Sequence, residues 1–359
     1  MLPIESLFYL VPAFILSGVI VYVVVPGIIK SCEKHGLMAM DVHKPNKPEI
    51  AEPGGIAILI AFIFSILLIV LFQSIIDLLL KYPILDLILN PSVVTDTVTV
   101  NHVLLAAVLS VVIAGLIGFI DDVFKIRWRT KILLGFLPAL PLMVLQVGKT
   151  TVYVPFLGTG VPFGILYPLL IVPLAVNFAF NSYNMLAGMN GMETGLGIIS
   201  LATILIATLL PPLIKPSDVN LDVIIFVACL LGALVVFLKF NWTPAKILIG
   251  DSGTLTIGTA IYVALVIGNM EWLAVGIFAI YLLNFILFVV YILTKQKAKL
   301  ATVDEQGKII APCPYTMYWI FPYYFKGMTE KQNVLVLYCV QTVMCVFGLL
   351  LFLFFALLV

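Results

Sequence analysis

Long apolar runs separated by short polar segments recur along the whole sequence. A helix that crosses the hydrocarbon core of a bilayer needs about 20 predominantly apolar residues. Ten segments of the 359-residue chain have this character, namely residues 7–29, 56–76, 103–120, 132–147, 164–182, 195–214, 222–238, 253–268, 273–293 and 334–357. The pattern predicts an all-α polytopic membrane protein, with about ten transmembrane helices in a single membrane-embedded domain over residues 1–359.

The composition agrees with a membrane protein and excludes a soluble domain. Hydrophobic residues make up 63% of the chain and charged residues 10%, whereas a soluble domain carries roughly 25% charged residues. The five Cys residues show no C-x-x-C spacing, so neither a zinc site nor a disulfide framework is predicted. The first apolar run lacks a basic n-region and is expected to be a retained helix. The net charge of +1 gives no indication of a partner, and no nucleic acid is expected.

The Lys and Arg residues are unequally distributed between two sets of connections. One set contains 16 of the 19 basic residues and comprises residues 30–55, 121–131, 183–194, 239–252 and 294–333. The other set contains only Lys81, Lys149 and Lys215. Basic residues accumulate on the cytoplasmic side, so the first set is predicted to be cytoplasmic and both termini to lie outside. A β-branched run and a Gly turn within residues 150–160 predict a small extracytoplasmic β-hairpin between the fourth and fifth spans.

A transporter or channel is the first alternative to an enzyme. No Asp, Glu, Lys or Arg lies inside the ten predicted spans, apart from Asp222 at the boundary of one. A charge at mid-membrane costs at least about 2.5–3.5 kcal/mol and usually marks an ion or proton path. Transporters also often consist of paired half-repeats, and no repeat is visible. The sequence therefore favours chemistry at the cytoplasmic face over transport.

Two adjacent carboxylates, Asp121 and Asp122, end the apolar run of residues 103–120. Four cations follow within ten positions, namely Lys125, Arg127, Arg129 and Lys131. Two adjacent carboxylates repel each other, and beside a low-dielectric slab they need a divalent cation or a basic cluster for neutralisation. A solvated helix end would explain a single Asp, whereas the acidic pair with nearby lysines favours a functional site.

Amides and a third carboxylate recur at the same predicted face. The spacing of Asn177, Asn181 and Asn184 places them on one face of a helix. Such amides can join helices, or they can bind a nucleobase, a phosphate or Mg²⁺. Asp251 precedes another span, where it is either a helix N-cap or a metal ligand beside a helix N-terminus. Carboxylates, amides and lysines together suit Mg²⁺-dependent phosphoryl transfer, which needs mainly positioning and charge neutralisation.

Two further alternatives are a CDP-alcohol phosphotransferase-type lipid enzyme and an inactive scaffold. The first requires a D-x-x-D-G type of spacing, which does not occur, and no Walker A motif is present either. The intact acidic and amide positions argue against an inactive scaffold. A late aromatic segment, residues 318–325, could form a belt at the lipid surface.

Four motifs in order resemble the polyprenyl-phosphate N-acetylhexosamine-1-phosphate transferases. These motifs are Asp121–Lys131, Asn184–Glu193, Gly250–Gly253 and Pro312–Pro314. They are similar above all to the archaeal and eukaryotic branch that makes dolichyl-diphospho-N-acetylglucosamine. The resemblance implies transfer of N-acetylglucosamine-1-phosphate from UDP-N-acetylglucosamine (UDP-GlcNAc) to a polyprenyl or dolichyl phosphate, with release of UMP. This would be the first step of lipid-linked oligosaccharide synthesis for glycosylation.

The resemblance also implies a role for each matching residue. Asn184 and Asp251 would hold Mg²⁺, or Mn²⁺ in its place. The catalytic residues would be Asp121, Asp122 and Lys125, with Asp121 as a base on the lipid phosphate if one is needed. Lys131 and Asn181 would bind that phosphate. The nucleotide sugar would contact Met40, Asp41, Val42, Glu52 and Asn190.

One departure from the family pattern concerns the sugar. The eukaryotic enzymes carry Arg and His directly after Pro-Cys-Pro, where this chain has Tyr315, Thr316 and Met317. A transferase of the same family with a different UDP-sugar is therefore the alternative to a UDP-GlcNAc enzyme. The active site is expected to face the cytoplasm, in the plasma membrane of an archaeon or the endoplasmic reticulum of a eukaryote. A homodimer is compatible with this interpretation.

Overall fold

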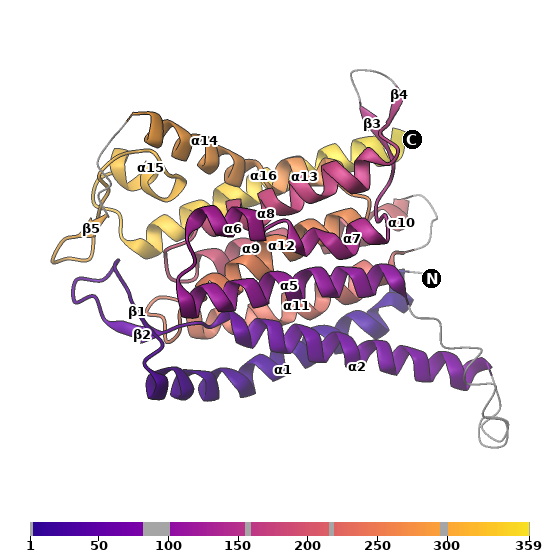
Figure 1. The fold of residues 1–359 in the computed structure, drawn as a ribbon, viewed down its shortest axis with the longest axis horizontal. Helices are drawn as coiled ribbons and strands as arrows, with labels where there is room; N and C mark the ends of the chain where they lie inside the picture. Colours follow the sequence, from indigo (N-terminus) through magenta and orange to yellow (C-terminus); the bar gives the residue numbers. More distant parts are fainter. Residues whose placement is uncertain (1–2, 82–100, 155–158, 215–218, 295–300, 359) are drawn as a thin grey trace.

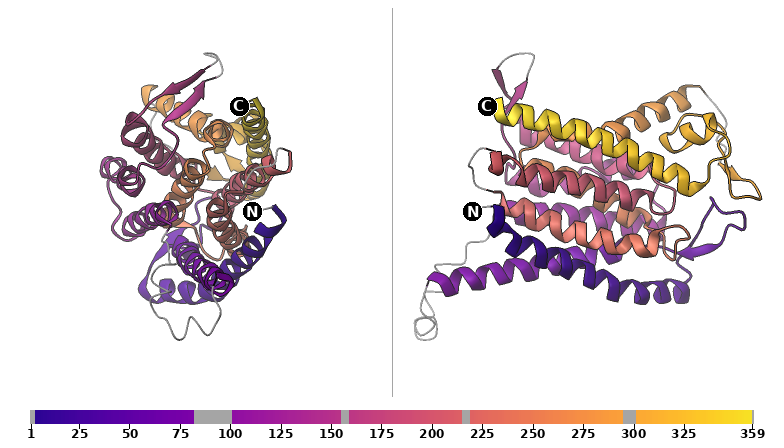
Figure 2. Two further views of the ribbon diagram at one scale, coloured as in Figure 1. Left: turned by 90° about the vertical axis from the view of Figure 1, so that its right-hand side faces the viewer. Right: turned by 180° about the vertical axis from the view of Figure 1, so that it is seen from behind.

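Helices dominate the computed structural model, which describes residues 3–81, 101–154, 159–214, 219–294 and 301–358. The helices run side by side in one bundle, and the chain begins and ends at the same end of it (Figures 1 and 2). Seven described helices are long and apolar enough to cross a membrane: α1 (Pro3–His35), α2 (Gly55–Lys81), α5 (His102–Phe124), α9 (Met192–Leu209), α11 (Leu221–Asn241), α12 (Gly250–Ile267) and α16 (Glu330–Leu358). The chain is therefore an integral, multi-pass, all-α membrane protein, as predicted.

Three of the ten expected spans consist of shorter helical pieces. The expected span 132–147 is divided into α6 (Trp128–Leu134), a 3₁₀ turn and α7 (Leu140–Val144). Pro138 and Pro141 explain this division, because proline lacks the amide hydrogen that a continuous helix requires. The expected span 164–182 combines a π-helical turn (Tyr167–Ile171) with α8 (Val172–Met185).

The ninth expected span is bent rather than straight. It consists of α13 (Glu271–Ile277) and α14 (Ala279–Leu293), which meet at an angle of 55°. Counted as one span, this pair brings the described membrane helices to eight by length and composition. Ten crossings with outward termini stay a prediction. Two short helices complete the described set, α10 (Pro211–Ile214) and α15 (Met317–Tyr324).

Three antiparallel strand pairs lie at the two ends of the bundle (Figure 1). β1 (Met38–Met40) pairs with β2 (Glu49–Ala51), and β5 (Thr302–Val303) pairs with β6 (Ile309–Ile310), both at the end away from the termini. The predicted hairpin is confirmed as β3 (Thr151–Val154) and β4 (Thr159–Pro162), at the end that carries the termini. Residues 155–158 and four of the basic residues used for orientation lie outside the described part of the chain: Lys215, Lys295, Lys297 and Lys299.

Close backbone contacts position the start of α12 in the middle of the bundle. A Cβ atom on Gly55 of α2 would overlap the backbone nitrogen of Gly253, and one on Gly118 of α5 would overlap the backbone of Asp251. Small residues at membrane helix interfaces permit such close approach of two backbones. Gly54 and Gly55 also donate backbone hydrogen bonds to Leu248 and Ile249, at 2.8 and 2.7 Å. The first turn of α12 is therefore held rigidly between α2 and α5.

The substitution Gly55→Ala is expected to destabilise the protein and reduce its activity. The added methyl group meets backbone atoms, which cannot move aside as a flexible side chain would, so the cost is about 3 kcal/mol or more. Thermal unfolding in detergent measures this effect as a lower apparent unfolding temperature. Gly27→Ala in α1 is the matched control, because a Cβ atom there meets nothing within 4 Å. Equal unfolding temperatures for the two variants would contradict this account of the packing.

Candidate active site

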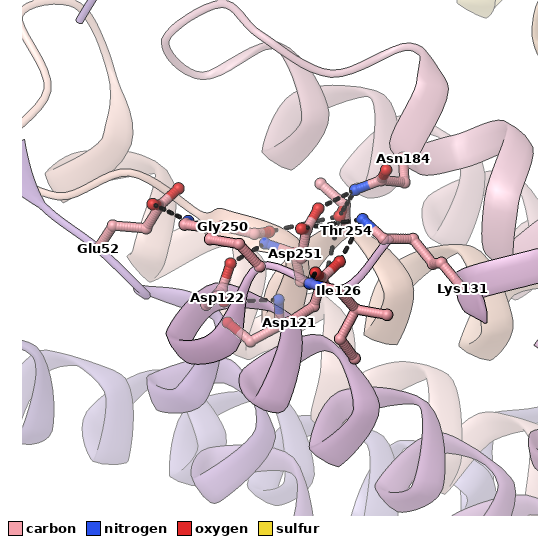
Figure 3. Close-up of polar contacts among 11 residues, drawn as sticks. Glu52, Asp121, Asp122, Ile126, Lys131, Asn184, Gly250, Asp251 and Thr254 are labelled. Atoms are coloured by element: carbon pink, nitrogen blue, oxygen red, sulfur yellow. Dashed lines mark hydrogen bonds and ion pairs between the residues drawn. The ribbon is translucent and has the colours of Figure 1, made fainter. Parts of the chain in front are cut away.

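Acidic, amide and basic side chains meet at the end of the bundle opposite the termini (Figures 1 and 3). Asp121 and Asp122 lie in the last turn of α5, and Asp251 lies in the first turn of α12. Asn184 is contributed by the end of α8 and Lys131 by α6. Segments that are far apart in the sequence thus bring five of the predicted site residues together.

Asp122 caps the N-terminus of α12 from a neighbouring helix. Its Oδ1 accepts the backbone N–H of Asp251 at 2.7 Å, and its Oδ2 accepts that of Ser252 at 2.9 Å. The N-cap residue of α12 is Ile249, which makes no side-chain cap. The interpretation of Asp251 as the N-cap is therefore wrong, because Asp122 satisfies the unpaired amides of this helix end. The carboxylate of Asp251 is left to face the other polar groups.

Lys131 joins two of the carboxylates. Its Nζ lies 3.0 Å from Oδ2 of Asp251 and forms an ion pair with Asp121, with 17% of the side chain exposed. Burial alone would lower the pKa of Lys131, but the charges of Asp251 and Asp121 raise it overall. Asp121 also accepts the backbone N–H of Ile126 at 2.7 Å, which fixes the turn after α5. Lys131 is therefore held as a charged ammonium between two carboxylates.

Asn184 completes the cluster from the side of α8. Its Nδ2 donates to Asp251 and, at 2.8 Å, to Oγ1 of Thr254. Because the amide nitrogen makes both bonds, the carbonyl oxygen of Asn184 points away from Asp251 (Figure 3). Rotated toward Asp251, this carbonyl oxygen would be a suitable second ligand for a hard cation.

The donor set fits a Mg²⁺ ion that is held partly by substrate. Asp121 and Asp251 flank the ammonium of Lys131, and Asp122 lies beside them against the backbone of Asp251, so three carboxyl groups gather around one described ammonium. Within the described ranges, no three His, Cys, Asp or Glu side chains form a metal-binding group. Mg²⁺ commonly binds through one or two protein groups together with substrate phosphates. Asp251 and Asn184 would supply those protein groups.

A cavity of about 330 Å³ adjoins the cluster. Its wall includes all five residues predicted to contact the nucleotide sugar, namely Met40, Asp41, Val42, Glu52 and Asn190. Asp122, Lys125, Asn184 and Asp251 line the same cavity. Ligand cavities typically measure about 300–1,000 Å³, so the space is large enough for a small ligand. The structure thus brings the predicted nucleotide and metal residues to one cavity.

Three predicted residues lie outside the lining of this cavity. Asp121 and Lys131 adjoin it through Asp251. Asn181 instead donates to Oδ1 of Asn177 at 2.8 Å, and Asn177 donates to the backbone of Ile132 at 2.7 Å. These two amides therefore join α8 to α6, whereas Asn184 belongs to the site.

Lys125 is the least constrained of the predicted catalytic residues. Its Nζ lies 3.6 Å from Oε2 of Glu52, and 71% of its side chain is exposed. Burial raises the pKa of the Glu52 carboxyl group. An ion pair at this distance with one exposed partner contributes little stability, so Lys125 can turn toward a ligand.

Several polar residues around the cavity were not predicted from the sequence. Glu193 is buried and accepts the backbone N–H of Gly188, and Thr254 supports Asn184. Glu193 belongs to a glycine-rich motif, which was a usable signal, and Thr254 follows Asp251 by nearly one helical turn. Lys44 and Glu330 gave no such signal, because both resemble ordinary solvated charges in a loop and a first helical turn.

Comparisons with known proteins agree with this site. The glycosyl transferase family 4 model matches residues 104–269, the segment that contains Asp121, Lys131, Asn184 and Asp251. A protein from Saccharolobus solfataricus is 32% identical over 278 residues, or 76% of each chain, and one from Sulfolobus acidocaldarius is 31% identical over 304 residues, or 84% of each. A Dictyostelium discoideum protein is 27% identical over 300 residues, covering 75% of this chain and 69% of the relative.

All three relatives are named as UDP-N-acetylglucosamine–dolichyl-phosphate N-acetylglucosaminephosphotransferases. Two of them exceed 30% identity over more than two thirds of both chains. The chain therefore belongs to glycosyl transferase family 4 and is a membrane-embedded glycosyl-1-phosphate transferase.

Proposed function

We propose that this enzyme transfers N-acetylglucosamine-1-phosphate from UDP-GlcNAc to a polyprenyl phosphate of the dolichyl type. The products are N-acetylglucosaminyl-diphospho-polyprenol and UMP, and the reaction is the first step of lipid-linked oligosaccharide synthesis. The observation that carries this proposal is the single cavity that joins Asp251 and Asn184 to the five residues expected around the nucleotide. The names of the relatives supply the sugar and the lipid.

The proposed reaction is a displacement at the β-phosphorus of UDP-GlcNAc. An oxygen of the lipid phosphate forms a bond to this phosphorus, and the bond to the oxygen of UMP breaks. The electron pair leaves with UMP, so no oxidant, reductant or further reactant is needed. Phosphoryl transfer of this kind depends mainly on positioning and on neutralisation of charge. When bound, Mg²⁺ supplies the charge that neutralises the pyrophosphate.

The side chains of the cluster have separate tasks in this scheme. Asp251 and Asn184 hold the metal, and Asp122 fixes Asp251 through the backbone of α12. Lys131 binds the lipid phosphate, which brings this phosphate close to Asp121 and Asp251. Met40, Asp41, Val42, Glu52 and Asn190 hold the nucleotide sugar in the adjoining cavity.

The site end of the bundle is proposed to face the cytoplasm. This proposal rests on the excess of Lys and Arg in the connections at that end. Lys47 is exposed in the first of these connections, so a Lys47→Cys variant tests the orientation. Cys339, the exposed native cysteine, is replaced by Ser in this variant so that the label reports on residue 47. A membrane-impermeant thiol reagent should fail to label it in intact cells and should label it in inverted vesicles. Labelling in intact cells would reverse the orientation.

The function is tested with purified protein, polyprenyl phosphate, Mg²⁺ and a panel of UDP-sugars. UMP should appear with UDP-GlcNAc, only in the presence of the lipid phosphate, and a chelator should abolish its release. If UMP is released only from a different UDP-sugar, the class of reaction stands and that sugar is the substrate. No release of UMP from any member of the panel would contradict the proposed function.

A further inference from the structure

A closed ring of polar contacts lies at one wall of the cavity. Nδ2 of Asn190 donates to Oδ2 of Asp41 at 2.8 Å, and the same oxygen lies 3.4 Å from Nζ of Lys44. Lys44 forms an ion pair with Glu330, and Oε1 of Glu330 accepts the backbone N–H of Asn190 at 2.9 Å. Asn190, Asp41 and Glu330 are each only 4% exposed.

The ring connects segments that are distant in the sequence. Asp41 and Lys44 belong to the first connection, Asn190 precedes α9, and Glu330 is the first residue of α16. Oγ1 of Thr243, which follows α11, lies 3.3 Å from Glu330 and adds a fourth segment. The ring therefore fixes the relative positions of the loops that close this side of the cavity.

The members of the ring have two different relationships to the cavity. Asp41 and Asn190 line it, whereas Lys44 and Glu330 lie behind them and are not part of its lining. A buried ion pair is a weak source of stability, because desolvation offsets much of the attraction between the charges. Here the ion pair helps to fix the orientation of Asn190 and Asp41. Because Nδ2 of Asn190 is bound to Asp41, its amide plane is fixed and its carbonyl oxygen has a defined direction.

We propose that Lys44 and Glu330 are positioning residues that set the affinity for the nucleotide sugar without touching it. They act through Asn190 and Asp41, which they hold in the wall of the cavity. This inference rests on the proposed function, because it takes the nucleotide sugar to be the occupant. Neither residue contacts the reacting groups around Asp251, so their effect belongs to binding and not to the chemical step.

Single variants measure this effect as a change in KM. Glu330→Gln keeps an acceptor for Asn190 but removes the charge, and Lys44→Met removes the ammonium. Lys44→Met leaves Asp41 and Glu330 without their shared cation, and Glu330→Gln breaks the ion pair that joins Glu330 to the first connection. In each case the KM for the nucleotide sugar should rise about tenfold, equivalent to about 1.4 kcal/mol. The kcat value and the KM for the lipid phosphate should stay within about twofold. Asn190→Ala removes the side chain that lines the cavity, so its KM gives the largest increase expected from loss of this contact.

A double variant separates positioning from general damage. In Lys44→Met combined with Glu330→Gln, the ion pair that each single variant breaks is lost only once, and Asp41 alone is left without a cation. The increase in KM should therefore be well below the product of the single effects. Lys44→Arg keeps the charge and should retain most of the affinity. Lys47→Met is the matched control, because Lys47 is exposed in the same connection and should leave KM unchanged.

Two further measurements are made on each purified variant. Calorimetry measures the binding of UMP, and thermal unfolding in detergent measures stability. Weaker UMP binding with a nearly unchanged unfolding temperature supports the positioning role. An active wild-type enzyme whose single variants show an unchanged KM, or whose double variant shows the full product of the single effects, overturns the inference. A fall in kcat at constant KM also overturns it. Failure of the wild-type protein to release UMP would instead contradict the proposed function.

Discussion

Replacement of Asp251 by Ala is expected to reduce kcat for UMP release by at least about a thousandfold, with the protein still inserted in the membrane. The carboxylate of Asp251 lies where Lys131 and Asn184 converge, and it is the proposed protein ligand of Mg²⁺. Its loss would remove the proposed metal ligand and one of the acidic partners of Lys131. The measurement is the steady-state rate of UMP release in detergent at saturating UDP-GlcNAc and polyprenyl phosphate.

Asp222→Asn is the matched control for this prediction. Asp222 lies at the start of α11, at the opposite end of the bundle, and accepts a hydrogen bond from Asn101 at 2.6 Å. Its neutralisation should leave kcat nearly unchanged. Wild-type turnover by Asp251→Ala, or an equal loss in both variants, would remove Asp251 from the metal site.

The substitution Lys131→Met is expected to lower kcat/KM for the lipid phosphate by about a hundredfold to a thousandfold. The ammonium of Lys131 balances Asp121 and Asp251, and without it the two carboxylates repel an incoming phosphate. The KM for UDP-GlcNAc should change much less, because Lys131 does not line the nucleotide cavity. Initial rates with varied polyprenyl phosphate at a fixed concentration of UDP-GlcNAc measure this difference.

Arg129→Gln is the corresponding control in the same helix. Arg129 is exposed and lies over the ring of Trp128, at 5.3 Å from its centroid, so it does not join the acidic cluster. Its replacement should change kcat/KM for the lipid by less than about threefold. Equal losses in the two variants would indicate that Lys131 contributes only general positive charge at the surface.

The class of fold and much of the site could be predicted from the sequence, because both depend on local patterns. Long apolar runs define the membrane helices regardless of how they pack, and the Lys and Arg bias divides the connections into two sets. The paired carboxylates, the Asn spacing and the glycine-rich turns occur in short segments. The resemblance implies roles for these residues, and the structure gathers most of them around one cavity.

Contacts between distant segments could not be predicted in the same way. The capping of α12 by Asp122 depends on how closely α5 approaches α12, which Gly118 permits. The acidic pair indicates a site, but no local pattern predicts that Asp122 caps another helix. The ion pair between Lys44 and Glu330 joins residues that are 286 positions apart. Asn181 shares the helical face of Asn184, but its position along α8 directs it to Asn177.

The central claim is that Asp251 and Asn184 hold a divalent cation at the wall of the nucleotide cavity. Anomalous X-ray diffraction from crystals grown with Mn²⁺ and UDP-GlcNAc locates such a cation directly. The account predicts one strong peak in contact with the carboxylate of Asp251, beside Asn184 and next to the pyrophosphate. A Mn²⁺ peak remote from Asp251, in a protein that releases UMP, would contradict it.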